Sequence, residues 1–102
     1  MDQFDRSRLL ISRDGVDRLK ASRVAVFGVG GVGGYVVEGL ARSGVGTLEL
    51  FDHDTVSLTD LNRQIIALHS TMGRSKVEVM AERIRDIAPD CRVVPHEMFY
   101  LP

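Results

Sequence analysis

The sequence contains a single cysteine, Cys91, among its 102 residues. One cysteine excludes an internal disulfide and a cysteine-based metal site, and it is typical of proteins from a reducing compartment. The first residues are polar and acidic, with no apolar stretch behind them, so we predict no secretory signal peptide. We therefore expect a cytoplasmic protein in which Cys91 is a small buried apolar residue.

Long apolar runs and an excess of one charge are also missing. The longest uncharged stretch, residues 24–37, is rich in glycine and shorter than the ~20 residues of a membrane-spanning helix. The formal net charge of −1 gives no general attraction to nucleic acid or to an anionic membrane. We expect no membrane partner, and a polyanionic ligand would need a local group of basic residues. Lysines are few, with only Lys20 and Lys76.

The most informative stretch that is present is a glycine motif behind an apolar run. Residues 24–27 lead into Gly28-x-Gly30-x-x-Gly33, and a helical pattern follows. This context is typical of a nucleotide-binding turn, in which Gly28 permits the tight turn and Gly33 lets the helix pack on the strand. Gly30 would let backbone N–H groups approach a phosphate, which the positive end of the helix dipole also attracts. A purely structural glycine turn is the alternative.

Hydrophobic periodicity predicts alternating strands and helices. The predicted strands are 23–27, 47–51 and 91–94, with Pro95 at the end of the third, and the predicted helices are 31–43 and 75–88. Gly44 would end the first helix, and Ser75 with Glu78 would form a capping box at the start of the second. The residues expected to face the core are Val32, Tyr35, Val36, Gly39 and Leu40 in the first helix and Val77, Met80, Ala81, Ile84, Ile87 and Ala88 in the second.

Right-handed connections would place the three strands parallel in the spatial order 3-2-1. The predicted fold class is α/β, a Rossmann-like three-layer architecture of which the chain holds only the N-terminal half, because no fourth strand follows. We divide the chain into a basic helical arm, residues 1–22, and a nucleotide-binding half-domain, residues 23–102. The apolar residues of the arm expected to contact the body are Leu9, Leu10, Ile11, Val16 and Leu19. The apolar tail, residues 98–102, has no predicted partner element.

In a parallel sheet, the segments that follow the carboxyl ends of the strands meet at one edge. The glycine turn would meet there with Asp52, Asp54, the polar connection 55–74 and Lys76. Asp52 follows Gly33 by nineteen positions, the place of an acid that binds a ribose hydroxyl, although a turn cap is the alternative. Asp54 could act similarly, bind a water molecule of Mg²⁺ or start the next turn. We assign no metal ligands, and the histidines, His53, His69 and His96, are interpreted as structural or solvated.

The basic residues on the same edge of the sheet indicate which nucleotide the site would bind. Glycine amides and a helix N-terminus suffice for the pyrophosphate of NAD. Transfer at a triphosphate develops more charge and needs additional cations. Arg63 and Lys76 are therefore unnecessary for NAD and expected for ATP.

The combined pattern resembles the ubiquitin-activating-like superfamily of adenylating enzymes, which includes the ThiF, MoeB and HesA proteins. It consists of Gly28-x-Gly30-Gly31-x-Gly33, Asp52-x-Asp54, Asn62-Arg63-Gln64 and Gly73-x-x-Lys76. Within the superfamily, residues 61–65 and 81–84 look most like the tRNA threonylcarbamoyladenosine dehydratases. These enzymes use ATP to cyclise a modified adenosine next to the anticodon.

The resemblance implies residue roles and a ligase-type reaction. Asp52 would hold the ribose of ATP, with phosphate contacts from Asn62, Arg63 and Lys76 and support of their loop by Gln64. A carboxylate would attack the α-phosphate to give an acyl-adenylate and pyrophosphate, and in the dehydratases a nearby nitrogen then closes a ring and expels AMP. The resemblance also implies a homodimer, because Arg8 matches an arginine that such enzymes insert into the ATP site of the partner subunit.

Some family features would lie outside this chain. The magnesium-binding aspartate follows a fourth strand, and the segments that recognise the carboxylate substrate lie beyond Pro102. We therefore expect weak or absent catalysis from these 102 residues alone. The alternatives are an activator of a ubiquitin-like sulfur-carrier protein, an NAD- or FAD-linked oxidoreductase that leaves Arg63 and Lys76 unused, and a non-catalytic interaction module.

Overall fold

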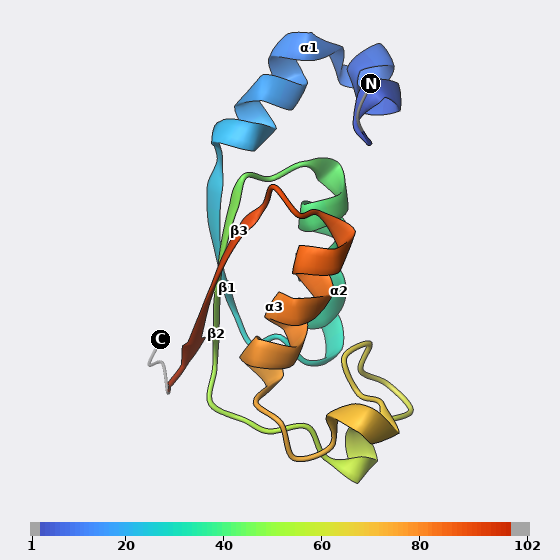
Figure 1. Ribbon diagram of the computed structural model, residues 1–102, viewed down its shortest axis with the longest axis vertical. Helices are drawn as coiled ribbons and strands as arrows, with labels where there is room; N and C mark the ends of the chain where they lie inside the picture. Colours follow the sequence, from blue (N-terminus) through green and yellow to red (C-terminus); the bar gives the residue numbers. More distant parts are fainter. Residues whose placement is uncertain (1–2, 99–102) are drawn as a thin grey trace.

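The computed structural model describes residues 3–98, so most of the apolar tail lies outside the described residues. A three-stranded sheet carries two long helices, and a further helix precedes it (Figure 1). The elements are α1 (Asp5–Ala21), β1 (Arg23–Phe27), α2 (Gly31–Ser43), β2 (Thr47–Asp52), the 3-10 turns η1 (Leu58–Asp60) and η2 (His69–Thr71), α3 (Lys76–Ile87) and β3 (Arg92–Glu97). The bounds predicted for β1 and α2 are confirmed, and Gly44 ends α2 in the left-handed conformation with φ 101°.

The strands are parallel, and β2 lies between β1 and β3. This confirms the predicted order and the Rossmann-like fold class. Strand β3 was predicted too short, because it continues through Pro95, which pairs with Leu50 of β2. Proline is tolerated there because β3 is an edge strand of the described sheet and needs no donor on its open side.

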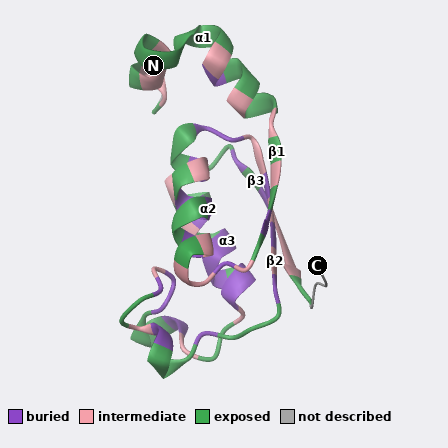
Figure 2. Cartoon of the chain, turned by 180° about the vertical axis from the view of Figure 1, so that it is seen from behind, coloured by how far each residue is buried: buried purple, intermediate pink, exposed green. Residues whose placement is uncertain are grey.

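Helices α2 and α3 pack against the same face of the sheet, so the described residues make two of the predicted layers (Figure 1). Between them lies the core, in which Leu48 and Leu50 of β2 meet Met80 and Ile84 of α3. Figure 2 shows this buried surface on the inner sides of both helices. The inward stripe predicted for α3 is confirmed: Val77, Met80, Ala81, Ile84 and Ala88 are buried and Ile87 packs against them.

The predicted inner face of α2 is wrong for four of its five residues, and of these five Leu40 alone packs against the core. Val32 is 80% exposed and Tyr35 is 58% exposed, and Val36 and Gly39 are exposed as well. The residues buried instead are Gly34, Val37, Glu38 and Ala41. The glycines explain the difference. A Cβ atom on Gly33 would overlap the carbonyl oxygen of Gly28, and one on Gly34 would lie 2.7 Å from that of Val29. This close approach to the turn fixes the rotation of a helix that is apolar on nearly every side.

Glu38 of α2 is buried and forms an ion pair with Arg83 of α3. Its Oε1 accepts hydrogen bonds from Arg42 at 2.8 Å and from Arg83 at 3.1 Å. Burial alone would raise the pKa of Glu38, but these two guanidinium groups outweigh it and lower the pKa. The carboxylate of Glu38 therefore joins the two helices through an ion pair.

Helix α1 is kinked at Ser12, which has φ 72° and whose hydroxyl accepts a hydrogen bond from the N–H of Gly15. After the kink, Val16 is fully buried and Leu19 packs against the core. The prediction that Leu9, Leu10 and Ile11 contact the body is wrong, because all are exposed on the segment before the kink. None of the helices in residues 3–98 has the length and apolar character needed to cross a bilayer.

Candidate functional site

The glycine turn joins the carboxyl end of β1 to α2. Gly28 has φ 86°, a conformation that favours glycine, and its N–H donates to the carbonyl oxygen of Phe51 at 2.8 Å. Gly33 then allows α2 to approach the backbone of the turn. The first N–H groups of α2 consequently point toward the carboxyl edge of the sheet, the usual arrangement for binding an anion.

Asp52 ties this turn to the end of β2. Its Oδ2 accepts the N–H of Val29 at 3.0 Å, and its Oδ1 accepts the N–H of Asp54 at 3.0 Å. These two bonds are what the turn-cap interpretation predicts. An ionised carboxylate has about four acceptor positions, so two remain for a hydroxyl donor such as a ribose. Asp52 is buried, which fixes its position beside the glycine turn.

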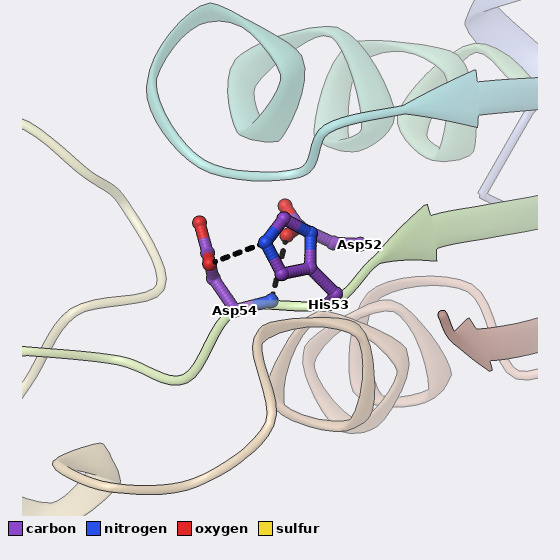
Figure 3. A group of neighbouring side chains, drawn as sticks. All are labelled: Asp52, His53 and Asp54. Carbon is purple, nitrogen blue, oxygen red and sulfur yellow. Dashed lines mark hydrogen bonds and ion pairs between the residues drawn. The ribbon is translucent and has the colours of Figure 1, made fainter. Parts of the chain in front are cut away.

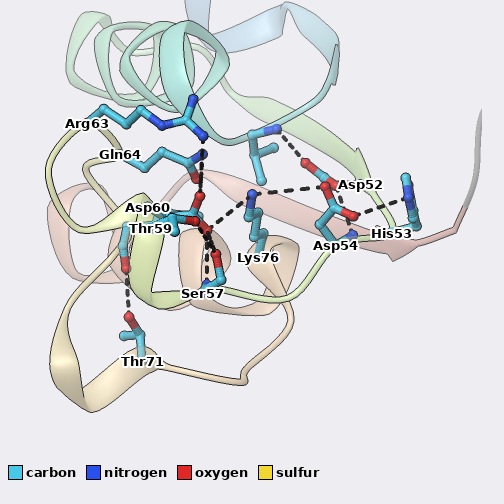
Figure 4. Close-up of polar contacts among 12 residues, drawn as sticks. Asp52, His53, Asp54, Ser57, Thr59, Asp60, Arg63, Gln64, Thr71 and Lys76 are labelled. Atoms are coloured by element: carbon cyan, nitrogen blue, oxygen red, sulfur yellow. Dashed lines mark hydrogen bonds and ion pairs between the residues drawn. The ribbon is translucent and has the colours of Figure 1, made fainter.

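A cleft of about 310 Å³ lies between the glycine turn, the end of β2 and the start of α3 (Figure 4). The residues that line it are Gly28, Gly30, Gly31, Asp52, His53, Asp54, Arg63, Gln64 and Lys76. The structure thus brings together most of the predicted site. Asn62 is exposed and is not part of this lining, and Gly33 acts in packing. Arg8 lies in α1, beyond the opposite end of the sheet (Figure 1), where it pairs with Asp5 at 3.0 Å.

Lys76 reaches the cleft from the first position of α3. It is only 7% exposed, and its Nζ lies 3.5 Å from Oδ2 of Asp60 and 4.0 Å from Oδ2 of Asp54. Its backbone N–H donates to the carbonyl oxygen of Asp54 at 3.0 Å. The ammonium group and the glycine turn therefore line the same cleft.

The capping box predicted at Ser75 is wrong. Its hydroxyl is buried and makes no cap bond, nor any other hydrogen bond within the described part of the chain. Ser75 instead forms an antiparallel bridge with Thr55, which sets the direction in which the backbone enters α3. The bridge brings the connection after β2 next to the start of this helix, and so places Lys76 beside Asp54.

Asp60 is the central residue of the site that our sequence reasoning missed. It is 4% exposed, and its Oδ2 accepts the backbone N–H of Ser57 at 2.9 Å and the hydroxyl of Ser57 at 3.1 Å. The backbone N–H of Ser57 lowers the pKa of Asp60 most, and its hydroxyl and Lys76 lower it further, against the effect of burial. A signal was present in the sequence, because Ser57 and Asp60 have capping-box spacing.

Gln64 and Arg63 follow Asp60 on the same connection. The Nε2 of Gln64 donates to Oδ1 of Asp60 at 3.0 Å, while its buried Oε1 has no hydrogen-bond partner among residues 3–98. The guanidinium of Arg63 lies 3.8 Å from Oδ1 of Asp60, with a side chain that is 69% exposed. One buried cation and one exposed cation therefore flank the cleft (Figure 4).

The end of β2 also gathers Asp52, His53 and Asp54 (Figure 3). One potential ligand atom from each lies within 4.8 Å of the others, and Nε2 of His53 is 3.1 Å from Oδ1 of Asp54. Two carboxylates and an imidazole suit a divalent cation. Both oxygens of Asp52 already accept backbone hydrogen bonds, however, so this carboxylate has a structural function without any metal.

Parallel strands in the order β1-β2-β3, a glycine turn before α2 and a carboxylate at the end of β2 define a Rossmann-like α/β protein. Its polar cleft lies at the carboxyl ends of the strands, where such proteins bind ligands. The chain belongs to the ThiF family, which matches residues 4–101. This confirms the superfamily predicted from the motifs.

The similar proteins include tRNA threonylcarbamoyladenosine dehydratases and a molybdopterin-synthase adenylyltransferase. The chain is 52% identical over 100 residues to the tRNA threonylcarbamoyladenosine dehydratase of Bacillus subtilis (strain 168), covering 98% of this chain and 39% of that protein. It is 43% identical over 82 residues to the molybdopterin-synthase adenylyltransferase of Escherichia coli (strain K12), covering 80% of this chain and 33% of that protein.

Among solved structures, the E. coli tRNA N6-threonylcarbamoyladenosine dehydratase in complex with ATP matches with a TM-score of 0.92 and 42% identity. The match covers 95% of this chain and 40% of that chain. This chain therefore spans about two fifths of the length of each of these two dehydratases.

Proposed function

We propose that this chain forms the ATP-binding part of an adenylating enzyme that dehydrates N6-threonylcarbamoyladenosine in tRNA. The observation that carries the proposal is the position of Lys76, which lines the same cleft as the glycine turn. The named activity of the similar Bacillus subtilis protein and the ATP in the similar E. coli structure support the choice of reaction and nucleotide. We place the protein in the cytoplasm, with residues 1–22 as an arm and residues 23–102 as the nucleotide-binding part.

The geometry supports a separate role for each of these residues in the reaction. The N–H groups at the start of α2 bind a phosphate, and Arg63 and Lys76 neutralise the charge that develops on the phosphate oxygens. Asp52 accepts a ribose hydroxyl through its remaining lone pairs, and Gln64 supports the loop through its hydrogen bond to Asp60. Asn62 would contact a phosphate from its exposed position only after a shift of the connection. The substrate carboxylate forms a bond to the α-phosphorus and pyrophosphate leaves, after which a substrate nitrogen attacks the acyl carbon and AMP leaves.

A divalent cation fits the charge balance of this cleft. Asp52 and Asp54 line it, and the buried carboxylate of Asp60 lies next to its two cations, Arg63 and Lys76. A triphosphate would meet net negative charge there unless it arrived as a metal complex, which favours Mg²⁺–ATP. Asp54, with its exposed carboxylate, would contact a water molecule of the ion, and the family resemblance places the direct ligand outside this chain.

A homodimer explains how Arg8 could take part. Arg8 belongs to α1, which lies at the end of the sheet opposite the cleft (Figure 1), so it can reach an ATP site only in a second copy. The outward face of α2 offers an apolar surface for that copy, because Val32 and Tyr35 are exposed beside Val36. An apolar helix face of this kind is typical of an interaction surface.

The proposal is tested by the release of AMP from ATP in the presence of tRNA that carries threonylcarbamoyladenosine, using the full-length protein that contains this chain. Lys76→Ala and Arg63→Ala should each lower kcat/KM by at least tenfold. Lys20→Ala removes the other lysine, far from the cleft, and should leave the rate unchanged. Full activity of Lys76→Ala, or no AMP release by the unmodified protein, would contradict the proposal.

A second candidate is an activator of a ubiquitin-like sulfur-carrier protein. The similarity to the molybdopterin-synthase adenylyltransferase of E. coli favours it. Both candidates use the same cleft and the same adenylation step, so they differ only in the carboxylate that is activated. AMP release that depends on a carrier protein with a diglycine tail, and not on modified tRNA, would select this alternative.

A further inference from the structure

Asp60 connects the groups that we assign to phosphate binding. Its two carboxylate oxygens contact Gln64 at 3.0 Å, Lys76 at 3.5 Å and Arg63 at 3.8 Å. Both hydrogen bonds from Ser57 hold it in one orientation, and its low pKa keeps it ionised at neutral pH. A single buried carboxylate thus sets the positions of three side chains at one cleft (Figure 4).

The same carboxylate also competes with any anion in the cleft. Lys76 forms ion pairs with two carboxylates, at 3.5 Å to Asp60 and 4.0 Å to Asp54. A phosphate that binds this ammonium must share it with Asp60, or replace Asp60 as its nearest anion. The attraction between Lys76 and a phosphate is therefore weaker than that of an unpaired lysine.

We propose that Asp60 is a positioning residue that pre-arranges Lys76, Arg63 and Gln64 while its negative charge limits the affinity of the cleft for nucleotide. The inference rests on the proposed function, and it assigns Asp60 two effects of opposite sign. Its hydrogen bond with Gln64 and its ion pairs with Lys76 and Arg63 favour nucleotide binding by holding the three side chains. Its charge opposes binding and so speeds the release of the products.

The two effects can be separated by substitution. Asp60→Asn keeps the shape of the side chain and an acceptor for the N–H of Ser57, but it removes the charge. Its new amide group can donate to Oε1 of Gln64, which has no partner in the described residues, once the Gln64 amide rotates by a half turn. Asp60→Ala removes both the hydrogen bonds and the charge.

The expected results differ in sign between these two variants. Asp60→Asn should bind Mg²⁺–ATP and tripolyphosphate about three- to tenfold more tightly than the unmodified protein, because one competing charge near Lys76 is gone. Asp60→Ala should bind both more weakly, because the three side chains lose their common anchor. A matched control, Asp86→Asn, removes a carboxylate from the far part of α3 and should leave both affinities unchanged.

The measurement is isothermal titration of each full-length variant with Mg²⁺–ATP and, separately, with tripolyphosphate, together with the ligand-induced rise of the unfolding temperature. Equal or weaker binding by Asp60→Asn, or unchanged binding by Asp60→Ala, would overturn the role of Asp60 while leaving ATP binding in place. If tripolyphosphate follows the expected pattern but ATP binds no better than tripolyphosphate, the role of Asp60 stands and the proposed function fails. Absence of binding by every variant overturns both.

Discussion

The side-chain amide of Gln64 occupies the space that a Cβ atom on Gly30 would need. Its Oε1 lies 2.5 Å, and its Nε2 2.9 Å, from the ideal position of such an atom. Glycine at position 30 therefore makes room for a side chain of the connection after β2. The glycine motif and the Asn62-Arg63-Gln64 motif fit together as one unit, although positions 30 and 64 are far apart in the sequence.

Gly30→Ala should displace the amide of Gln64. The obstacle is the end of a flexible side chain, so the amide moves and its hydrogen bond to Asp60 at 3.0 Å is lost. We expect the free energy of unfolding to fall by about 1–3 kcal/mol, the usual cost of leaving a buried polar group unpaired. ATP binding should weaken as well. Urea unfolding and nucleotide titration measure the two effects.

The double variant with Gln64→Ala provides the control. Gln64→Ala removes the three atoms that lie nearest to the methyl group introduced by Gly30→Ala, so the double variant should lose less stability than the sum of the two single losses. Strict additivity of the three unfolding free energies would contradict the direct contact between these residues.

Gly33 and Gly39 lie in the same helix and should respond oppositely to alanine. A Cβ atom on Gly33 would overlap the carbonyl oxygen of Gly28, and the backbone cannot yield as a side chain can. We expect Gly33→Ala to cost at least about 1–3 kcal/mol of unfolding free energy, as overpacking does. Gly39 has no atom within 4 Å of an added Cβ, so Gly39→Ala should stabilise the helix by about 0.5–1 kcal/mol. Denaturant titration of both variants checks the sign of each change.

Local patterns predicted the elements well because each element has its own signal. The β-branched run and the glycine motif give the bounds of β1 and α2, and the apolar stripe of α3 faces the core as expected. The face of α2 could not be predicted in the same way. Its apolar residues lie on nearly every side, and the close approach of Gly33 to Gly28 decides which side is inside.

Topology predicted the position of a site residue only where that residue lies at the end of a strand or at the start of a helix. Asp52, Asp54 and Lys76 meet as expected, because parallel strands place their carboxyl ends together. Asn62 and Asp60 belong to a long connection without regular periodicity. There, the hydrogen bonds of η1 select Asp60 as the inward residue and leave Asn62 exposed.

The buried carboxylate of Glu38 should make stability depend on pH. Its pKa is lowered in the folded state, so its contribution is present above the unfolded value of about 4.3 and is lost as the pH falls through the folded value. Glu38→Gln should cost about 1–3 kcal/mol at pH 7, because Arg42 and Arg83 lose their shared anion. Urea unfolding at pH 7 and pH 3 measures the cost. An equal cost at both values would show that the charge of Glu38 contributes nothing.

Cys91 precedes β3 and is buried, and this burial raises the pKa of its thiol. A buried thiol with a raised pKa supplies little thiolate, so alkylation by iodoacetamide should be much slower in the native protein than in urea. Cys91→Ala keeps an apolar side chain and should cost less than about 1.5 kcal/mol, as small apolar replacements do. Cys91→Ser replaces the weakly polar thiol with a more polar hydroxyl at a buried position and should cost about 1–3 kcal/mol. Greater stability of the serine variant than of the alanine variant would mean that Cys91 contributes through its polar character, contrary to its position next to the core residues Ala88 and Val93.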